Sequence, residues 1–225
     1  MSERFYYPES FQKNEIVHLP DSEKHHLQKV LRIKPNEKVE LVDGKGSLAT
    51  AIVEKEGCRI LDILRGLKEK EVLLGIPYMR PSKLEWVLEK TTEIGVTGLF
   101  LYRADKSTQK VFSDHQIQRF VNILISGLKQ SKRLFLPSLE ILTDFNELLS
   151  KDADIFFGDV RKTAPPLQLN CDKPLFISGP ESGFSEKEIS ILDKKGTGVC
   201  LNQNILRAET APIVASSLFL YNKLT

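Results

Sequence analysis

The stretch "LFISGPESGFSEKE" spans Leu175–Glu188 and joins a short apolar run to a polar segment through a Gly-Pro turn. Ser185, followed three residues later by Glu188, forms a capping box that predicts a helix start at about Ser185. The turn therefore follows a buried strand and precedes a helix N-terminus. Because open α/β sheets bind ligands at the carboxyl ends of their strands, the turn is a candidate ligand loop.

The glycines of this turn do not match a known phosphate-binding pattern. Both G-x-x-x-x-G-K-[ST] and G-x-G-x-x-G are absent from the stretch. The loop carries the carboxylate of Glu181 and no cation, which suits a cationic or hydroxyl-rich ligand better than a polyphosphate. An ordinary strand-to-helix turn remains the alternative.

Around this stretch, apolar runs alternate with amphipathic segments. Strands are predicted at 72–78, 98–102, 138–142, 153–159, 174–178 and 198–202. Helices are predicted at 81–94, with a Ser82–Glu85 capping box and a stop at Gly95, and at 114–130, 144–150, 185–196 and 209–222. This alternation predicts a parallel α/β sheet.

The first 70 or so residues have a different character. Strands are predicted at 15–19, 38–44, 47–56 and 59–64. One helix, 21–33, interrupts them, with a cap at Asp21 or Ser22 and an apolar stripe of Leu27, Val30 and Leu31. Several strands and one helix predict a small barrel, with a domain boundary near residues 68–74.

Composition narrows the class of protein. The chain has 225 residues, 41% hydrophobic and 28% charged, with a net charge of +2, which neither requires nor opposes a nucleic-acid partner. No run is long enough to span a membrane, and no signal peptide is recognisable. Cys58, Cys171 and Cys200 are too dispersed for a disulfide framework and indicate reduced core residues of a cytoplasmic protein. The histidines show no metal-ligand spacing, so no metal is expected.

A second polar turn occurs in "LNQNILRAETAPIVA" (201–215), where Arg207 and Glu209 lie between a strand and the last helix. We expect both turns to follow neighbouring strands and to line one pocket. The alternative is a surface Arg–Glu pair of little energetic weight.

Together, "GPESGFS" and "LNQNILRAETA" resemble the paired C-terminal motifs of the RsmE-like family, the 16S ribosomal RNA uridine N3-methyltransferases of the SPOUT class. "HHLQKVLRIKPNEKVELVDGKG", "KLEWVLEKTTEIGV", "DKSTQK" and "KQSKR" resemble further segments of that family in the same order. The resemblance covers nearly the whole chain.

The resemblance implies a PUA-like β-barrel that binds RNA at residues 1–70 and a SPOUT methyltransferase domain with a C-terminal trefoil knot at 73–225. It also implies a cytoplasmic homodimer that uses S-adenosyl-L-methionine (SAM) to methylate N3 of a uridine in 16S ribosomal RNA of the small subunit. Cofactor-binding residues carried over from the motifs are Ile177, Gly179, Pro180, Glu181, Gly183, Leu201, Asn202, Ile205, Leu206 and Thr210.

Methylation of uridine N3 requires loss of its proton, so a base or an electrostatic aid is expected. Arg207, Glu181 and Glu209 are the catalytic candidates, and the sequence does not rank them. Predicted RNA-binding residues are Arg4, His25, Arg32, Gln130, Ser131 and Arg133.

Each role has a simpler alternative. Leu201, Ile205 and Leu206 are apolar enough to be packing residues, and Glu209 and Thr210 are placed to cap the last helix. His25 with its neighbour, and Gln130 with the residues after it, also suit a surface or helix-end role.

Several positions depart from the family pattern. Ser182, Asn202 and Lys132 replace glycines, and Pro212 replaces an alanine, so Pro212 must lie in the first turn of the last helix. These changes leave open a non-catalytic RNA-binding relative or a methylase of another SPOUT branch.

Overall fold

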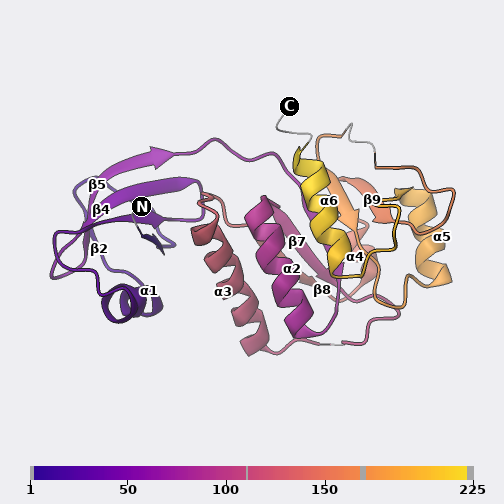
Figure 1. Cartoon of the computed structure of the whole chain (residues 1–225), viewed down its shortest axis with the longest axis horizontal. Helices are drawn as coiled ribbons and strands as arrows, with labels where there is room; N and C mark the ends of the chain where they lie inside the picture. The colour runs from indigo at the N-terminus through magenta and orange to yellow at the C-terminus, as the bar shows by residue number, and fades with distance from the viewer. Residues whose placement is uncertain (1–2, 110, 168–170, 222–225) are drawn as a thin grey trace. The chain divides into compact units, whose positions relative to one another are not determined.

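The computed structural model describes residues 3–109, 111–167 and 171–221, and these form two compact units (Figure 1). The first unit holds Met1–Glu69 and Ile125–Leu136, and the second holds Lys70–Leu124 and Pro137–Thr225. The predicted last helical residue, Asn222, lies outside the described residues.

The first unit is built on one five-stranded sheet in the order β1-β3-β4-β5-β2. Its elements are β1 (Arg4–Tyr6), β2 (Ile16–Val17), α1 (Asp21–His25), η1 (His26–Val30), β3 (Lys38–Val42), β4 (Ser47–Val53) and β5 (Cys58–Arg65). The four predicted strands are present, and β1 is an addition. Among the described residues no backbone pairing joins β1 to β2, so hydrogen bonding does not close the sheet into the expected barrel.

The predicted helix 21–33 is wrong in its second half. After α1 the chain forms the π-helical turn η1, in which the Leu31 amide donates to the His26 carbonyl at 2.9 Å. The wider turn rotates Val30 away from the core and leaves this residue 59% exposed. Leu27 is buried as expected. Pro20 stands at the N-cap position, and no side chain caps this helix.

Residues 125–136 belong with the first unit because specific contacts hold them there. Lys129 donates to Glu23 at 2.5 Å, and the Gly46 amide donates to the Leu134 carbonyl at 3.0 Å. Local pattern gave no sign of this return, since the segment continues an ordinary amphipathic helix.

The second unit combines helices with one sheet (Figure 1). The six strands of this sheet are all parallel, in the order β11-β9-β10-β6-β7-β8. Its elements are β6 (Leu73–Pro77), α2 (Pro81–Ile94), β7 (Gly98–Tyr102), α3 (Asp114–Gln130), β8 (Ser138–Leu142), α4 (Phe145–Leu148), β9 (Asp154–Gly158), β10 (Pro174–Ile177), α5 (Glu186–Lys195), β11 (Thr197–Val199) and α6 (Thr210–Tyr221). The expected parallel sheet is confirmed. Helices α2 and α6 lie side by side, and α6 also packs on β10 and β6.

The start of α2 differs from the prediction. Pro81 opens the helix after Arg80, and neither Ser82 nor Glu85 makes the capping bonds. Glu85 is used elsewhere, because its carboxylate accepts from Arg119 at 2.8 Å. Gly95 ends the helix as predicted, in the left-handed conformation with φ of 117°.

The cores of the two units consist mainly of aliphatic and aromatic side chains. Cys58 is buried in the first core, as expected, and burial raises the pKa of its thiol to about 11. Cys171 and Cys200 are only partly buried, so their prediction as core residues is wrong.

Candidate functional site

The two predicted ligand loops lie at the carboxyl edge of the parallel sheet. The first loop, residues 178–184, follows β10, and the second loop, residues 200–209, follows β11. The expectation that these strands are neighbours is wrong, because β9 lies between them. The connection through α5 carries the chain from β10 past β9 to the far side of that strand, where β11 pairs with it. Local sequence does not indicate this strand order.

Lys83, from the first turn of α2, connects the two loops. Its Nζ lies 2.7 Å from Glu181 Oε1 in the first loop and 3.0 Å from Glu209 Oε1 in the second. Lys83 is not among the predicted site residues, although it begins the segment "KLEWVLEKTTEIGV" that resembles the family. Two carboxylates and one ammonium leave this cluster with one net negative charge, which suits a cationic ligand.

Glu209 is the buried member of this cluster. Its Oε2 atom is buried and has no hydrogen-bond partner among the described residues. Burial alone would raise the pKa of Glu209. Hydrogen bonds from its own backbone amide and from Lys83, with the charges of Lys83 and Arg207, outweigh burial and hold the pKa below its ordinary value. Glu209 is therefore an anion at neutral pH.

The first loop has the backbone that the glycine pattern suggests. Gly183 has φ of 71°, and no atom lies within 4 Å of the place where a Cβ would be. Ser182 does not have a positive φ, so the replacement of a glycine by serine causes no backbone strain at this position. Glu181 is exposed and Pro180 is buried, while Gly179 packs against the ring of Phe184.

The second loop exposes an apolar side chain. Ile205 is 82% exposed, which contradicts a packing role for it, whereas Leu201 and Leu206 are half-buried. Asn202 accepts from the Asn204 amide at 2.9 Å through its side chain, and it does not adopt the left-handed region.

The end of the second loop leads directly into α6. The Arg207 carbonyl accepts from the Thr210 amide at 2.9 Å, and Thr210 is the first residue of the helix. Pro212 is the third residue of α6, so its predicted place in the first turn is confirmed. The Arg207 side chain is exposed and makes no hydrogen bond or ion pair within 3–109, 111–167 and 171–221.

One predicted cofactor residue belongs to the core. The side chain of Ile177 is fully buried among hydrophobic residues at the end of β10. Next to it, the Ser178 carbonyl accepts from the Tyr102 hydroxyl at 2.7 Å. Only the backbone of Ile177 is therefore placed to face a ligand.

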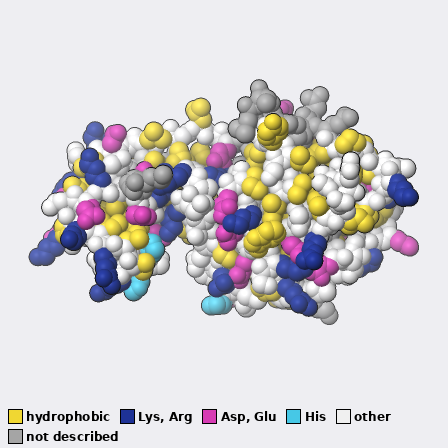
Figure 2. All heavy atoms as spheres, viewed as in Figure 1, with side chains coloured by type: hydrophobic (Ala, Val, Ile, Leu, Met, Phe, Trp, Pro, Cys, Tyr) yellow, Lys and Arg dark blue, Asp and Glu magenta, His cyan; other side chains and the backbone are white. Residues whose placement is uncertain are grey.

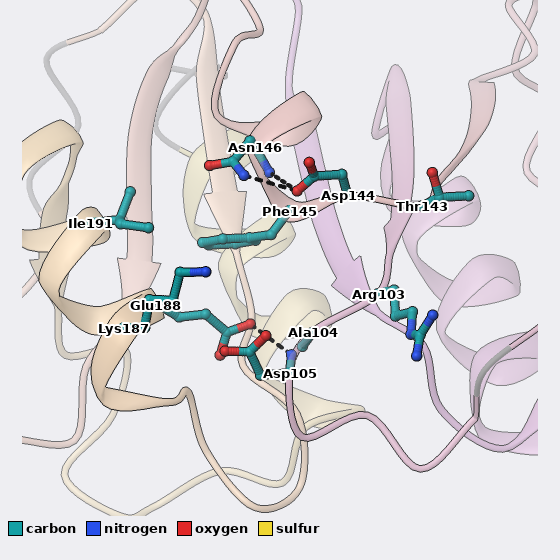
Figure 3. A pocket seen from close by; sticks show the side chains of 10 residues that line it. All are labelled: Arg103, Ala104, Asp105, Thr143, Asp144, Phe145, Asn146, Lys187, Glu188 and Ile191. Carbon is teal, nitrogen blue, oxygen red and sulfur yellow. Dashed lines mark hydrogen bonds between the residues drawn. The ribbon is translucent and has the colours of Figure 1, made fainter.

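The far end of the first loop is anchored by the α5 capping box, which is present as predicted. Glu188 accepts from the Ser185 amide at 2.7 Å and from the Asp105 amide at 2.9 Å, and the Ser185 hydroxyl lies 2.6 Å from Asp105 (Figure 3 shows the Glu188–Asp105 bond). Lys106 also donates to the Phe184 carbonyl at 3.0 Å. Asp105 and Lys106 thus hold the loop from the side of β7.

A cavity of about 290 Å³ lies beside this anchor, between 103–105, 143–146 and the start of α5 (Figure 3). Its acidic side chains are already hydrogen-bonded; Asp144, for example, accepts from the Asn146 amide at 2.8 Å. Arg103 and Lys187 make no hydrogen bond or ion pair among the described residues, and Figure 3 shows them on opposite sides of the cavity. Among the described residues, the charged side chains of the cavity that have no partner are therefore two cations.

Two of the predicted RNA-binding residues are engaged in structure within the first unit. Arg4 donates to Glu40 at 2.9 Å, and Arg133 is buried and paired with Glu69. The remaining candidates differ in exposure: His25, Arg32 and Gln130 are exposed, and Ser131 is half-buried. Ser131 donates to the Gly127 carbonyl at 2.6 Å.

Within the described ranges, no group of three His, Cys, Asp or Glu residues could hold a metal ion. In the same ranges, none of the helices combines the length and the apolar character needed to cross a bilayer.

Comparison with known proteins adds two family matches. The model of the RNA methyltransferase domain matches residues 67–220, and that of the RNA methyltransferase PUA domain matches residues 19–63. The first match covers the whole sheet of the second unit and both loops of the site.

Curated relatives and solved structures agree with these matches. The chain is 28% identical to ribosomal RNA small subunit methyltransferase E 2 of Borreliella burgdorferi, over 87% of this chain and 86% of that protein. It is 28% identical to the corresponding enzyme of Synechocystis sp., over 88% of this chain and 71% of that protein. The crystal structure of ribosomal RNA small subunit methyltransferase E from Neisseria gonorrhoeae, bound to S-adenosyl methionine, superposes with a TM-score of 0.87 at 27% identity, covering 99% and 98% of the two chains.

Proposed function

Because this chain belongs to the RNA methyltransferase family, we propose that it transfers a methyl group from SAM to ribosomal RNA of the small subunit. The observation that carries the proposal is the convergence of the two motif loops on Lys83, which makes one site of them. The similar Neisseria gonorrhoeae enzyme is bound to SAM, which supports the same cofactor here.

The residues of the site suit SAM. The molecule carries a sulfonium cation and a ribose but no phosphate, and the cluster of Lys83, Glu181 and Glu209 carries one net negative charge without a phosphate-binding motif. When bound, SAM supplies an electrophilic methyl group. The proposed contacts come from both loops: Gly179, Pro180, Glu181, Gly183, Leu201, Asn202, Ile205, Leu206 and Thr210, with the backbone of Ile177.

For the target atom we propose N3 of a uridine in 16S ribosomal RNA, on the basis of the motifs. The N3 proton must leave, and the structure bears on which group assists. The pKa of Glu209 is held below its ordinary value although burial opposes this, which weakens Glu209 as a base, and the Glu181 carboxylate is engaged by Lys83. Arg207 has its donors available, so we assign it the stabilisation of negative charge on the uracil or of a nearby phosphate.

We also propose the trefoil knot that the motifs imply. Two features support it: β11 lies at the edge of the sheet, and the chain then returns to place α6 against β10 and β6 in the middle. The second loop therefore runs across the carboxyl edge of the sheet, beside the first loop. A crossing of this kind is rare in proteins and is a known feature of few folds.

A homodimer acting in the cytoplasm is proposed as well. On the face shown in Figure 2, hydrophobic side chains gather over α2 and α6, and Trp86 of α2 is 44% exposed. An exposed apolar patch of this kind favours association with another protein surface. Light scattering during gel filtration should give about twice the chain mass of 25.5 kDa.

The function is tested with small subunits from a strain that lacks this protein. Incubation with the protein and SAM should produce a reverse-transcription stop at one uridine, since N3-methylation blocks the base-pairing edge. Arg207→Ala should reduce the rate of transfer with little effect on SAM affinity. SAM binding without transfer would identify a non-catalytic relative, and a modified base without a stop would identify another target atom.

A further inference from the structure

Lys83 joins three parts of the second unit that are distant in sequence. It lies in the first turn of α2, and its two partners lie in the first loop and at the end of the second. Glu181 is separated from Lys83 by 98 positions. One ammonium group therefore contacts both loops.

The two ends of this bridge differ in burial. The side chain of Glu181 is 48% exposed, whereas that of Glu209 is 11% exposed. An exposed ion pair contributes little by itself. A buried carboxylate, in contrast, depends on its cation, because the loss of one partner leaves an uncompensated charge.

The second carboxylate oxygen of Glu209 makes this residue more dependent on Lys83. Oε2 is buried without a hydrogen-bond partner, so among the described residues Lys83 is the one side-chain donor to this carboxylate. Without Lys83, either the carboxylate takes up a proton or the second loop moves to bring it to water.

We propose that Lys83 is a positioning residue of the cofactor site, which holds the first and second loops in the arrangement that receives SAM. The identity of the ligand rests on the proposed function, whereas the coupling of the loops does not. Lys83 acts here through Glu181 and Glu209, without contact with the reacting atoms.

A positioning role and a purely electrostatic role predict opposite effects. Removal of the Lys83 ammonium makes the cluster more negative, so simple attraction would then bind the cationic cofactor more tightly. If Lys83 positions the loops, its removal instead weakens SAM binding, because the loops must be ordered again on binding.

The test compares Lys83→Met with a control on the same helix. Lys90 also contacts two carboxylates, Glu89 at 2.7 Å and Glu93 at 2.9 Å, but both belong to α2. Lys90→Met thus also removes a lysine with two carboxylate partners, but wild-type Lys90 does not connect any loops. Hydrogen exchange of residues 178–184 and 200–209 is measured together with SAM affinity by calorimetry.

Lys83→Met should accelerate exchange in both loops and weaken SAM binding about tenfold, which corresponds to about 1.4 kcal/mol. Lys90→Met should change neither. Lys83→Arg should retain most of the wild-type affinity, since a guanidinium can also bridge two carboxylates. Unchanged loops, or tighter binding of SAM, in Lys83→Met would overturn the proposal.

A second variant isolates the buried charge. Lys83→Met/Glu209→Gln removes the unpaired carboxylate and should restore the protection of the second loop but not of the first. In Lys83→Met alone, only Arg207 and the backbone amide of Glu209 still oppose the effect of burial on this carboxylate, so the pKa of Glu209 should rise. Protonation at the lower pH then removes the buried charge, and the second loop should be better protected at about pH 5 than at about pH 8. Equal protection factors at both pH values, after correction for the intrinsic pH dependence of amide exchange, would count against the role of Glu209. If wild type binds no SAM, the proposed function fails, and loop exchange alone decides on Lys83.

Discussion

At the scale of single residues, the strain expected from lost glycines falls on Lys132. The structure places Lys132 in the left-handed region, with φ of 62°, while Ser182 and Asn202 have ordinary backbone. A non-glycine residue in this region has its Cβ too close to a backbone carbonyl. Family pattern alone marks three replaced glycines, and only the backbone of the structure separates the strained position from the other two.

Lys132→Gly should therefore remove strain. The Lys132 side chain also pairs with Glu40 at 3.6 Å, a half-exposed contact of small energetic weight. Lys132→Ala is the matched control, because it loses the same ion pair and keeps the strain. We expect the glycine variant to be more stable than the alanine variant by about 1 kcal/mol in urea unfolding. Equal stability of the two would show that this position carries no strain.

At the scale of elements, the two capping-box patterns in the second unit gave different outcomes. Ser185 caps α5, accepting from the Glu188 amide at 3.1 Å, whereas Ser82 makes no capping bond at the start of α2. Pro81 already sets the first turn of α2, and Glu85 is drawn to Arg119. The same local pattern thus gave a cap only at α5, where the serine precedes the helix, and Glu188 keeps its bond to the Ser185 amide although it also accepts from the Asp105 amide.

Ser185→Ala should destabilise the protein by about 1 kcal/mol, because it removes the cap of α5. It also removes the bond to Asp105 that anchors the first loop. Ser82→Ala is the control in the other capping-box pattern, where the serine is the second residue of α2 and makes no capping bond, and it should stay within about 0.5 kcal/mol of wild type. Thermal or urea unfolding checks both variants, and similar losses in the two would contradict the assignment of the cap.

At the scale of the whole molecule, the net charge of +2 gives little general attraction for RNA. Affinity should therefore depend on individual exposed cations. Arg4 and Arg133 are already engaged within the first unit, so they are better described as structural residues there. Arg32 is exposed, and its φ of 52° places it in a turn just after η1.

Arg32→Asn should weaken binding to small-subunit RNA and lower the slope of log affinity against log salt by about one, as expected for one phosphate contact. Asparagine is chosen because it tolerates the left-handed region. Arg4→Met should instead lower the free energy of unfolding, because it removes the ion pair between Arg4 and Glu40. A normal salt slope in Arg32→Asn would remove Arg32 from the RNA-binding surface.

Much of the second unit could be predicted from the sequence. Strands and helices alternate along it with clear hydrophobic periodicity, and β6, β7 and β10 are runs that are buried at every residue. Helices α3 and α5 and strand β8 therefore agree closely with their predicted ranges. In the first unit, the π-helical turn was not predictable, because hydrophobic spacing does not distinguish a π turn from the end of an α-helix.

By itself, the sequence determined the element types, the two polar loops and the family, since these depend on residues that are near in the chain or form recognisable motifs. Tertiary structure alone decided that β9 separates β10 from β11, that residues 125–136 belong to the first unit, and that Lys83 unites the site. The physical reason is common to all three. Strand order, returning segments and ion pairs depend on which distant groups meet when the apolar faces are buried, and no local pattern specifies that meeting.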